Sequence, residues 1–229
     1  MIKKLFYGFT IAELIVAMSV IGVVAAITLP SVITNHQNKV LQMSLQKAYR
    51  DLDNNLEELH ASNYRKTFYQ SLLASTGGIK DFFKNYYNVS KSCEDTAQPC
   101  FAANYADIST TTDVEFACIG GTSVQLKDNT SICIIPAAAA QEAREAVAAD
   151  PANGIEAQEA QEAKDAVPAT IYMDVNGNEP PNIGGRDMFK FQIDNYTIVD
   201  NSEEANCTTS SVGEGCLKKI INDKWKVKY

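Results

Sequence analysis

The hydrophobic positions of this chain form two successive patterns in its first sixty residues. Residues 9–29 are an almost unbroken apolar run, in which Glu13 is the only charged side chain. After Pro30, hydrophobic residues recur at three- and four-residue spacing, which predicts an amphipathic helix with one apolar face. We expect this face to pack on a globular head and the helix to kink at Pro30. The apolar positions are Val32, Leu41, Leu45, Ala48, Leu52, Leu56 and Leu59.

Shorter helices and then strands are expected in the rest of the chain. Residues 65–76 and 78–90 have the pattern of two short helices joined at adjacent glycines. Beyond them, β-rich segments alternate with Gly-Gly and Asp-Asn turn signals, which predicts an antiparallel sheet. A long helix followed by such a sheet gives an α+β fold. The expected strands are residues 113–121, 122–129, 130–136, 169–175, 187–193, 196–200 and 223–229.

The composition changes abruptly to Ala, Glu and Gln over residues 137–168. The segment "QEAREAV" at 141–147 returns as "QEAKDAV" at 161–167. These residue types are strong helix formers, so two short helices are expected. Few large apolar side chains are available to anchor the segment. We therefore interpret it as an exposed insertion between two strands, with a contact surface as the alternative.

Composition and motifs also limit the classes of function. The chain has 229 residues, is 45% hydrophobic and carries a formal net charge of −8, which suits one globular domain and an anchor. No dense Lys/Arg patch occurs, so nucleic-acid binding is not expected. The sequence contains no HExxH, GxSxG, Cys/His pair or phosphate loop. We therefore expect no enzymatic activity.

All six cysteines follow the apolar run. An even number of cysteines on one side of a membrane span is typical of disulfides in an oxidising compartment. The alternatives are a reduced cytosolic set of cysteines and a zinc site, but no CxxC pair occurs. Proximity in sequence favours the pairs Cys93–Cys100, Cys118–Cys133 and Cys207–Cys216.

Glu13 is the residue that needs an explanation. An apolar helix of this length rises about 30 Å, enough to cross a bilayer core. An unpaired carboxylate in such a segment costs roughly 2.5–3.5 kcal/mol. Neither a secretory signal peptide cut near Ala26 nor a plain signal anchor accounts for it, although Lys3 and Lys4 would suit both.

The stretch "GFTIAELIVAMSVIGVVAAITLP" resembles the N-terminal signature of type IV pilins and type II secretion pseudopilins. In that family a basic leader ends in Gly, Phe becomes the first residue, and Glu follows four places later. The resemblance implies that a prepilin peptidase cleaves after Gly8 and methylates the new amine of Phe9. It also implies a leader at residues 1–8, a transmembrane or filament-core helix at 9–30 and a pilin-like head at 31–229.

The resemblance also implies a role for Glu13. Cleavage leaves a cationic amine among packed apolar helices, and a carboxylate of a neighbouring subunit can pair with it and set the register. The implied function is a structural subunit of a type II secretion pseudopilus or a related type IV filament, which sits in the inner membrane with its head in the periplasm. It polymerises with copies of itself and other pilin-like subunits through an inner-membrane assembly platform. The alternative is a membrane-tethered calcium-binding or adhesion module that does not polymerise.

Residues 174–189, "DVNGNEPPNIGGRDMF", are rich in Asp, Asn, Gly and Pro, which predicts a tight loop between strands. The loop resembles one in type II secretion pseudopilins, where calcium stabilises the C-terminal region. Asp174, Asn176 and Asn178 alternate, and Asp187 returns from the far side, so these oxygens are the expected calcium ligands. The alternative is a polar loop whose Asp and Asn side chains cap its own backbone.

Overall fold

The computed structural model describes Gly8 and residues 10–63, 68–94, 96–109, 113–137 and 167–227. The chain divides into two units, Met1–Val40 and Leu41–Tyr229, which we treat separately. Most of the expected leader, Phe9 and nearly all of the expected insertion at 137–168 lie outside the described residues.

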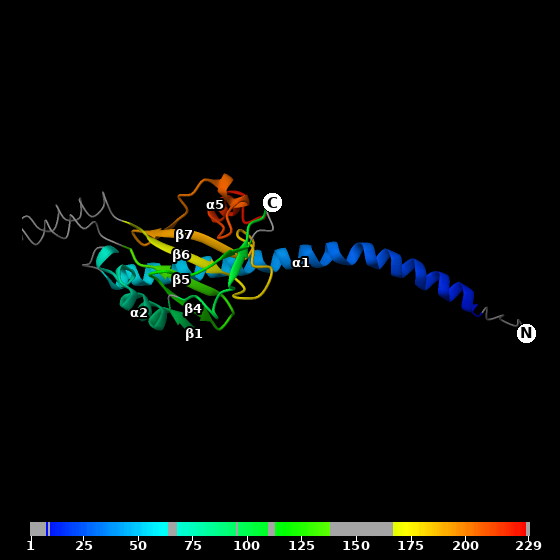
Figure 1. Cartoon of the computed structure of the whole chain (residues 1–229), viewed down its shortest axis with the longest axis horizontal. Coiled ribbons are helices and arrows are strands. Elements are labelled where there is room, and N and C mark those ends of the chain that lie inside the picture. Colours follow the sequence, from blue (N-terminus) through cyan, green and yellow to red (C-terminus); the bar gives the residue numbers. More distant parts are fainter. Residues whose placement is uncertain are drawn as a thin grey trace, which may run out of the picture. The chain divides into compact units, whose positions relative to one another are not determined.

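The first described element is the helix α1, Ile11–Ser62, which continues through Pro30 (Figure 1). Within the described part of the chain, α1 is the one helix long and apolar enough to cross a membrane. Its most apolar window has a mean hydropathy of 2.3, and none of that window is buried. A single N-terminal helix of this kind is consistent with membrane anchoring.

The head contains an antiparallel sheet of six strands in the order β1-β4-β5-β6-β7-β8. A second sheet pairs β2 (Asn104–Ala106) with β3 (Asp113–Glu115). The long helix and the antiparallel sheet confirm the predicted α+β, pilin-like fold. The strands of the large sheet are β1 (Val89–Glu94), β4 (Thr122–Leu126), β5 (Ser131–Ile135), β6 (Ala169–Asp174), β7 (Met188–Asp194) and β8 (Thr197–Val199).

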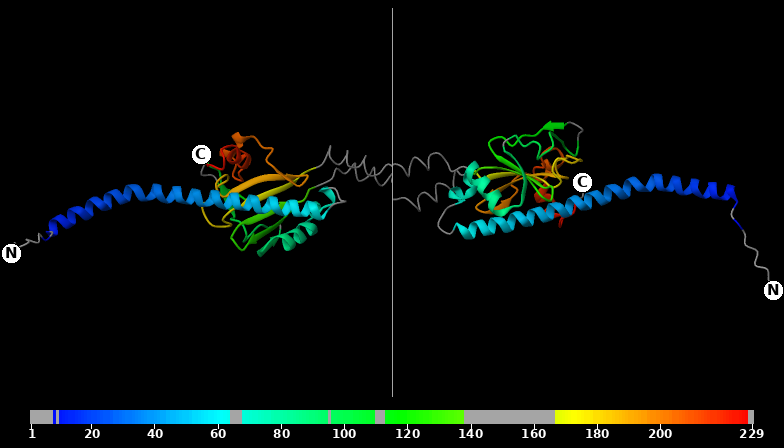
Figure 2. Two further views of the ribbon diagram at one scale, coloured as in Figure 1. Left: turned by 180° about the vertical axis from the view of Figure 1, so that it is seen from behind. Right: turned by 90° about the horizontal axis from the view of Figure 1, so that it is seen from below.

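One face of the sheet packs against helices and forms the main core. Figure 2 shows residues 41–62 of α1 and the helix α2 (Thr76–Tyr86) on this face. Alternate strand residues such as Ile132 and Ile134 point into this core. The apolar stripe predicted for α1 is buried from Leu45 onward, namely at Leu45, Ala48, Leu52, Leu56 and Leu59.

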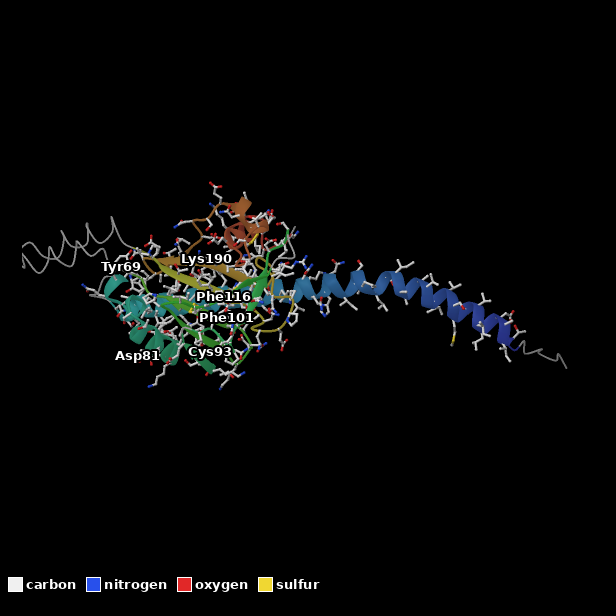
Figure 3. The ribbon with its side chains drawn as sticks, viewed as in Figure 1. Tyr69, Asp81, Cys93, Phe101, Phe116 and Lys190 are labelled. Atoms are coloured by element: carbon white, nitrogen blue, oxygen red, sulfur yellow. A yellow bond between two sulfur atoms is a disulfide. The ribbon has the colours of Figure 1, made fainter. Side chains whose placement is uncertain are left out.

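A second, smaller core covers the opposite face of the sheet, where β2 and β3 lie. Phe101 and Phe116 pack there with ring centroids 4.9 Å apart (Figure 3). Cys133 of β5 belongs to this second core, whereas its neighbours belong to the first. Because strands such as β5 are buried on both faces, their sequences are nearly continuous apolar runs. The sequence analysis did not predict this second layer.

Of the two helices predicted after α1, the first is wrong and the second is confirmed with shifted bounds. Instead of a helix at 65–76, the described residues form two short 3₁₀ turns, η1 (Phe68–Gln70) and η2 (Leu72–Ala74). The hydroxyls of Ser71 and Ser75 accept bonds from Leu73 N and Gly78 N, at 3.2 and 3.1 Å, and so interrupt a continuous helix. The predicted helix at 78–90 starts earlier, at the beginning of α2, and gives way to strand β1 at its end.

The predicted strand at 223–229 is also wrong over its described part, residues 223–227. A turn η3 (Glu204–Thr208) and a helix α5 (Cys216–Asn222) precede this segment. Lys224 and Trp225 have φ angles of 57° and 60°, which a strand does not allow. Trp225 instead packs edge-on against Tyr49 of α1, with ring centroids 5.3 Å apart.

The six cysteines form the three pairs that sequence proximity favours, and no cysteine among the described residues is free. Only residues 113–115 of the predicted strand 113–121 are extended, and they pair with β2 rather than with β4. Cys118, three residues beyond this short strand, is bonded to Cys133 of β5. The pairs are Cys93–Cys100, Cys118–Cys133 and Cys207–Cys216.

Candidate functional site

Glu13 lies in the first turn of α1 and bonds to the residue that precedes the helix. Thr10 N donates to Glu13 Oε2 at 2.9 Å, and Glu13 N donates to Thr10 Oγ1 at 3.3 Å. This reciprocal pair is a capping box, which satisfies two backbone donors at the helix start. The sequence analysis overlooked it, although its signature, Thr-x-x-Glu, is readable in the sequence.

The remaining polar side chains of the apolar run are satisfied within the helix. Ser19 Oγ donates to Ile15 O at 2.8 Å, and Thr28 Oγ1 donates to Val24 O at 3.0 Å. The apolar side chains around them are exposed. A helix surface that is apolar all round needs an apolar environment outside its own chain. Glu13 carries the only charge in the run from residue 9 to residue 29.

Gly8, the predicted cleavage residue, is exposed, and a Cβ built on it would meet no atom within 4 Å. Nothing in the described part of the chain therefore requires glycine at this position. A requirement for glycine would have to come from a protein that acts on this segment.

The loop between β6 and β7 is the second candidate site. Asp174 ends β6 and Asp187 precedes β7, and both side chains are 0% exposed. Asp174 pairs in the sheet with Met188, so the two carboxylates lie at the same end of this strand pair. The structure thus brings together the two acidic residues that the sequence analysis selected.

Both carboxylates accept hydrogen bonds. Asn176 N donates to Asp174 Oδ1 at 3.0 Å, and the Tyr105 hydroxyl donates to Asp174 Oδ2. Asn182 N and Ile183 N donate to the two oxygens of Asp187, at 2.6 and 2.7 Å. The two aspartates therefore hold the loop in shape by capping its backbone.

The electrostatics of this pair are unfavourable without a cation. Burial raises the pKa of Asp174, and the negative charge of Asp187 raises it further. Burial also raises the pKa of Asp187, to about 6, against the opposing effect of the N–H bonds from Ile183 and Asn182. No lysine or arginine in the described ranges forms an ion pair with either carboxylate. Two buried like charges are costly in such an environment.

Amide oxygens of the same loop lack partners. Asn176 Nδ2 donates to Glu179 O at 2.6 Å and Pro180 O at 3.1 Å, but Asn176 Oδ1 is buried without a hydrogen bond. Asn182 Oδ1 is buried and unpartnered in the same way. Asn178, by contrast, is exposed.

Gly177 allows the loop to dock on the turn between β4 and β5. Its φ is +71°, and a Cβ there would lie 2.7 Å from both Asn129 O and Gln125 Nε2. Asn129 Nδ2 donates to Asn176 O at 2.7 Å across this contact. A glycine is needed here for both conformation and space.

Comparison with known proteins bears on the first of these two sites. Residues 3–29 match a family described as the prokaryotic N-terminal methylation motif. The chain carries a methylation motif. The matched segment includes Gly8, Phe9 and Glu13. Neither the curated proteins nor the solved structures that were compared match the chain.

The methylation motif indicates that the chain is a type IV pilin-like subunit processed by a prepilin peptidase. It implies assembly with pilin-like subunits, and α1 is consistent with anchoring through a single N-terminal helix. The motif covers the first site only and does not include the loop between β6 and β7.

The ligand atoms of that loop are of the type that calcium prefers. Calcium binds oxygen ligands, and this loop offers two buried carboxylates and two unpartnered amide oxygens. Asp174, Asp187 and Asn176 are among the ligands predicted from the sequence, Asn182 is not among them, and the predicted Asn178 is exposed. The described residues contain no cluster of three or more His, Cys, Asp or Glu side chains arranged for a metal. A calcium ion here would therefore depend on amide and backbone oxygens as well as on the two carboxylates.

Proposed function

We propose that this protein is a structural subunit of a type II secretion pseudopilus or a related type IV filament. The observation that carries the proposal is the methylation motif at residues 3–29, which runs into the exposed apolar start of α1, where Glu13 is the only charge up to residue 29. Cleavage between Gly8 and Phe9 retains this helix, and the head is displayed on the periplasmic side of the inner membrane. The proposal includes no catalytic step.

The charge of Glu13, which the capping box leaves without a counterion, allows a specific role in assembly. In the single chain, the carboxylate bonds to Thr10 and stabilises the first turn of α1. In a filament, the same carboxylate can pair with the methylated amine of a neighbouring subunit. The charge of Glu13 is then neutralised only after assembly, which makes the pair a device for register.

Processing is the first test of this proposal. Mass spectrometry of the protein from its native host should show a chain that starts at Phe9 and carries a methylated amine. Gly8→Val should leave the uncut precursor in the membrane. A mature chain that starts after Ala26 would show that the segment is a secretory signal peptide and would overturn the proposal.

Substitutions at two positions separate the charge of Glu13 from its capping role. Glu13→Gln removes the charge but keeps a side chain that can close the capping box. Thr10→Ala removes the cap but keeps the charge. We expect Glu13→Gln to abolish filament assembly and Thr10→Ala to reduce it only modestly, measured by shearing and electron microscopy. Processed wild-type chains that remain single in the membrane would instead favour the tethered, non-polymerising module.

We also propose that the loop between β6 and β7 binds calcium, which favours a pseudopilus subunit. Asp174, Asp187, Asn176 and Asn182 would hold the ion, and the ion would neutralise the two buried carboxylates. Support comes from the uncompensated charges and the unpartnered amide oxygens, together with the resemblance of the loop to that of pseudopilins.

Thermal unfolding of the full chain in nonionic detergent tests the calcium site. Calcium should raise the melting temperature relative to chelator, because an ion bound only by the native state stabilises it. Asp174→Asn and Asp187→Asn should each abolish the rise, whereas Asn178→Ala, at the exposed position, should leave it intact. A wild-type chain that melts at the same temperature with calcium and with chelator would mean that the loop only caps its own backbone.

A further inference from the structure

A cavity of about 450 Å³ lies between α2 and the strands β1 and β4. Its volume falls in the range of small-molecule sites. The side chains that line it are partly basic and partly apolar, and none of them is a carboxylate. They are Lys80, Phe83, Lys84, Tyr87, Asn88, Val89, Ser92, Thr122, Val124 and Lys127.

Two of the three lysines in this cavity have no counterion among the described residues. Lys80 Nζ lies 2.7 Å from Glu94 Oε1, outside the lining set. Lys84 and Lys127 form no ion pair with any described residue. In a chain with a formal charge of −8, two unpaired ammonium groups at one carboxylate-free cavity attract an anion.

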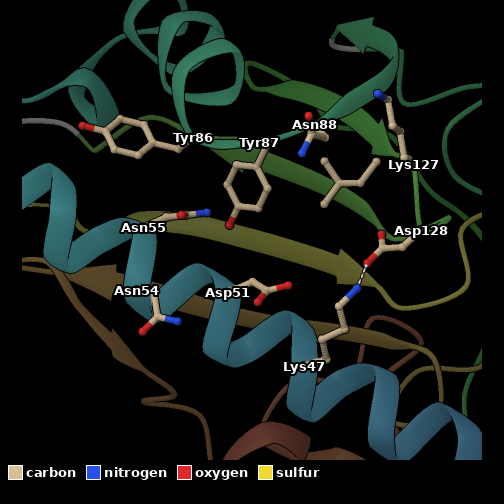
Figure 4. A pocket seen from close by; sticks show the side chains of 10 residues that line it. Lys47, Asp51, Asn54, Asn55, Tyr86, Tyr87, Asn88, Lys127 and Asp128 are labelled. Carbon is tan, nitrogen blue, oxygen red and sulfur yellow. Dashed lines mark hydrogen bonds and ion pairs between the residues drawn. The ribbon is translucent and has the colours of Figure 1, made fainter.

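The neighbouring cavity has different chemistry. It measures about 410 Å³ and shares Tyr87, Asn88 and Lys127 with the first cavity. Figure 4 shows the Lys47–Asp128 ion pair on its wall, with N and O 2.5 Å apart. The Lys127 side chain extends away from this pair. Two lysines and two aspartates thus line the second cavity, whereas three lysines and no carboxylate line the first.

A buried hydroxyl without a partner belongs to a residue on the wall of the first cavity. Thr122 is 1% exposed, and its Oγ1 has no hydrogen-bond partner in the described part of the chain. The same strand contributes Val124, and α2 contributes Phe83, as apolar wall. A buried hydroxyl without a partner is unfavourable, and a bound ligand with an acceptor oxygen would satisfy it.

We propose that this cavity binds a small organic anion. The apolar body of the ligand lies against Phe83 and Val124, and its carboxylate, sulfonate or phosphate group lies near Lys84 and Lys127. An oxygen of the ligand accepts a hydrogen bond from Thr122 Oγ1. This site is separate from both the methylation motif and the loop between β6 and β7, so it does not depend on filament assembly.

Equilibrium dialysis of the full chain tests the proposal. The same nonionic micelles are present on both sides of the membrane, so that partition of the probe into detergent cancels. Naphthalene-1-sulfonate, an aromatic ring system with one anionic group, should bind saturably with one molecule per chain. The uncharged analogue 1-naphthalenemethanol should bind at least about tenfold more weakly, because it lacks the charge-assisted contacts.

Substitutions of lining residues test whether the probe binds in this cavity. Lys84→Ala combined with Lys127→Ala should weaken naphthalene-1-sulfonate binding by about tenfold or more, since each charge-assisted contact is lost. Lys218→Ala, at an exposed lysine on α5, is the matched control and should leave binding unchanged. Thr122→Val should weaken it by about threefold or more, because an acceptor oxygen then lacks its donor.

Three results would overturn the proposal. They are no saturable binding by the wild-type chain, equal binding by the double lysine variant, and an equal loss in the Lys218 variant. Unchanged affinity in Thr122→Val would remove the threonine hydroxyl from the site. Both lysines are exposed, and circular dichroism should confirm that the variants are folded.

Discussion

The two ends of α1 use the same residue types for opposite purposes. Leu14 is 52% exposed, whereas Leu52 is 0% exposed. No described residue up to Val40 is buried, whereas the head from Leu41 onward contains its own core, sheet and three disulfides. Hydrophobic residues in the first unit are therefore exposed on a single chain, whereas many of those in the second are buried in the core of the head.

A matched pair of leucine truncations provides the strongest test of this contrast. Leu52→Ala should lower the free energy of unfolding of the head by about 2–5 kcal/mol, because it leaves a cavity in the core. Leu14→Ala removes the same atoms from the same helix but should leave that free energy unchanged. Denaturant unfolding of the full chain in nonionic detergent measures both. A destabilising effect of Leu14→Ala comparable to that of Leu52→Ala would break the contrast.

Removal of a disulfide should lower the stability of the head and leave the processing of the N-terminal segment unchanged. Cys207→Ser with Cys216→Ser should lower the free energy of unfolding by about 2–4 kcal/mol, because the bridge restricts the unfolded chain. The two cysteines are nine residues apart and are buried in the main core. Thermal unfolding without reductant measures the loss. Cleavage after Gly8 should proceed normally in the same variant, and a block of cleavage would show that the two units are coupled.

Two glycine substitutions should change head stability in opposite directions. Gly177→Ala should destabilise the head by about 1–3 kcal/mol, since it strains a positive φ and meets Asn129 O. Gly77→Ala, in α2 with open space around it, should stabilise the head by about 0.5–1 kcal/mol. Thermal unfolding measures both. Equal effects of the two substitutions would mean that the docking of the loop on the β4–β5 turn contributes nothing.

The smallest expected effect concerns the ion pair of Lys47 and Asp128. Burial alone would raise the pKa of Asp128, but the hydrogen bonds from Lys47 and Thr130 outweigh it and the pKa lies below its ordinary value. The stabilisation is therefore present above the unfolded pKa of about 4 and is lost as the pH falls through the folded value. Lys47→Ala should cost less than about 1 kcal/mol at neutral pH.

The free energy of unfolding, measured at decreasing pH, checks this prediction. At pH values below the folded pKa of Asp128, the Lys47 variant and the wild-type chain should have the same stability, because the pair is absent from both. A constant difference between the two proteins across the whole pH range would assign the effect of Lys47 to packing rather than to charge.

The sequence predicted best those parts of the fold that rest on local pattern. Strands β4 to β7 were expected because their apolar residues alternate or run together, and the helix stripe from Leu45 was expected from its spacing. Strand β1 was missed because it is an edge strand with mostly polar side chains and an irregular register. The C-terminal strand was wrong because the alternation in "KWKVK" does not reveal the positive φ angles at Lys224 and Trp225.

In the loop between β6 and β7, too, the sequence predicted what rests on local pattern and missed what depends on tertiary contacts. Asp174 and Asp187 were predicted because both lie within one polar loop. Tyr105 was missed, since its bond to Asp174 spans 69 residues and depends on the second core. Asn178 was selected by alternation, but the turn at Gly177 leaves it exposed. Sequence patterns identify residues within a loop, whereas the direction in which each side chain points depends on tertiary contacts.

The pairing of β5 with β6 has a practical consequence for engineering. Ile135 lies opposite Thr170 in an antiparallel ladder, so the chain leaves and re-enters the sheet at neighbouring positions. The ends of the connecting segment are therefore only about 5 Å apart, the spacing of adjacent strands, whatever length joins them. Closure entropy rises slowly with loop length. An epitope tag or a fluorescent domain inserted between residues 136 and 168 should leave the strand order intact, and this connection is the natural place to label the protein in a living cell.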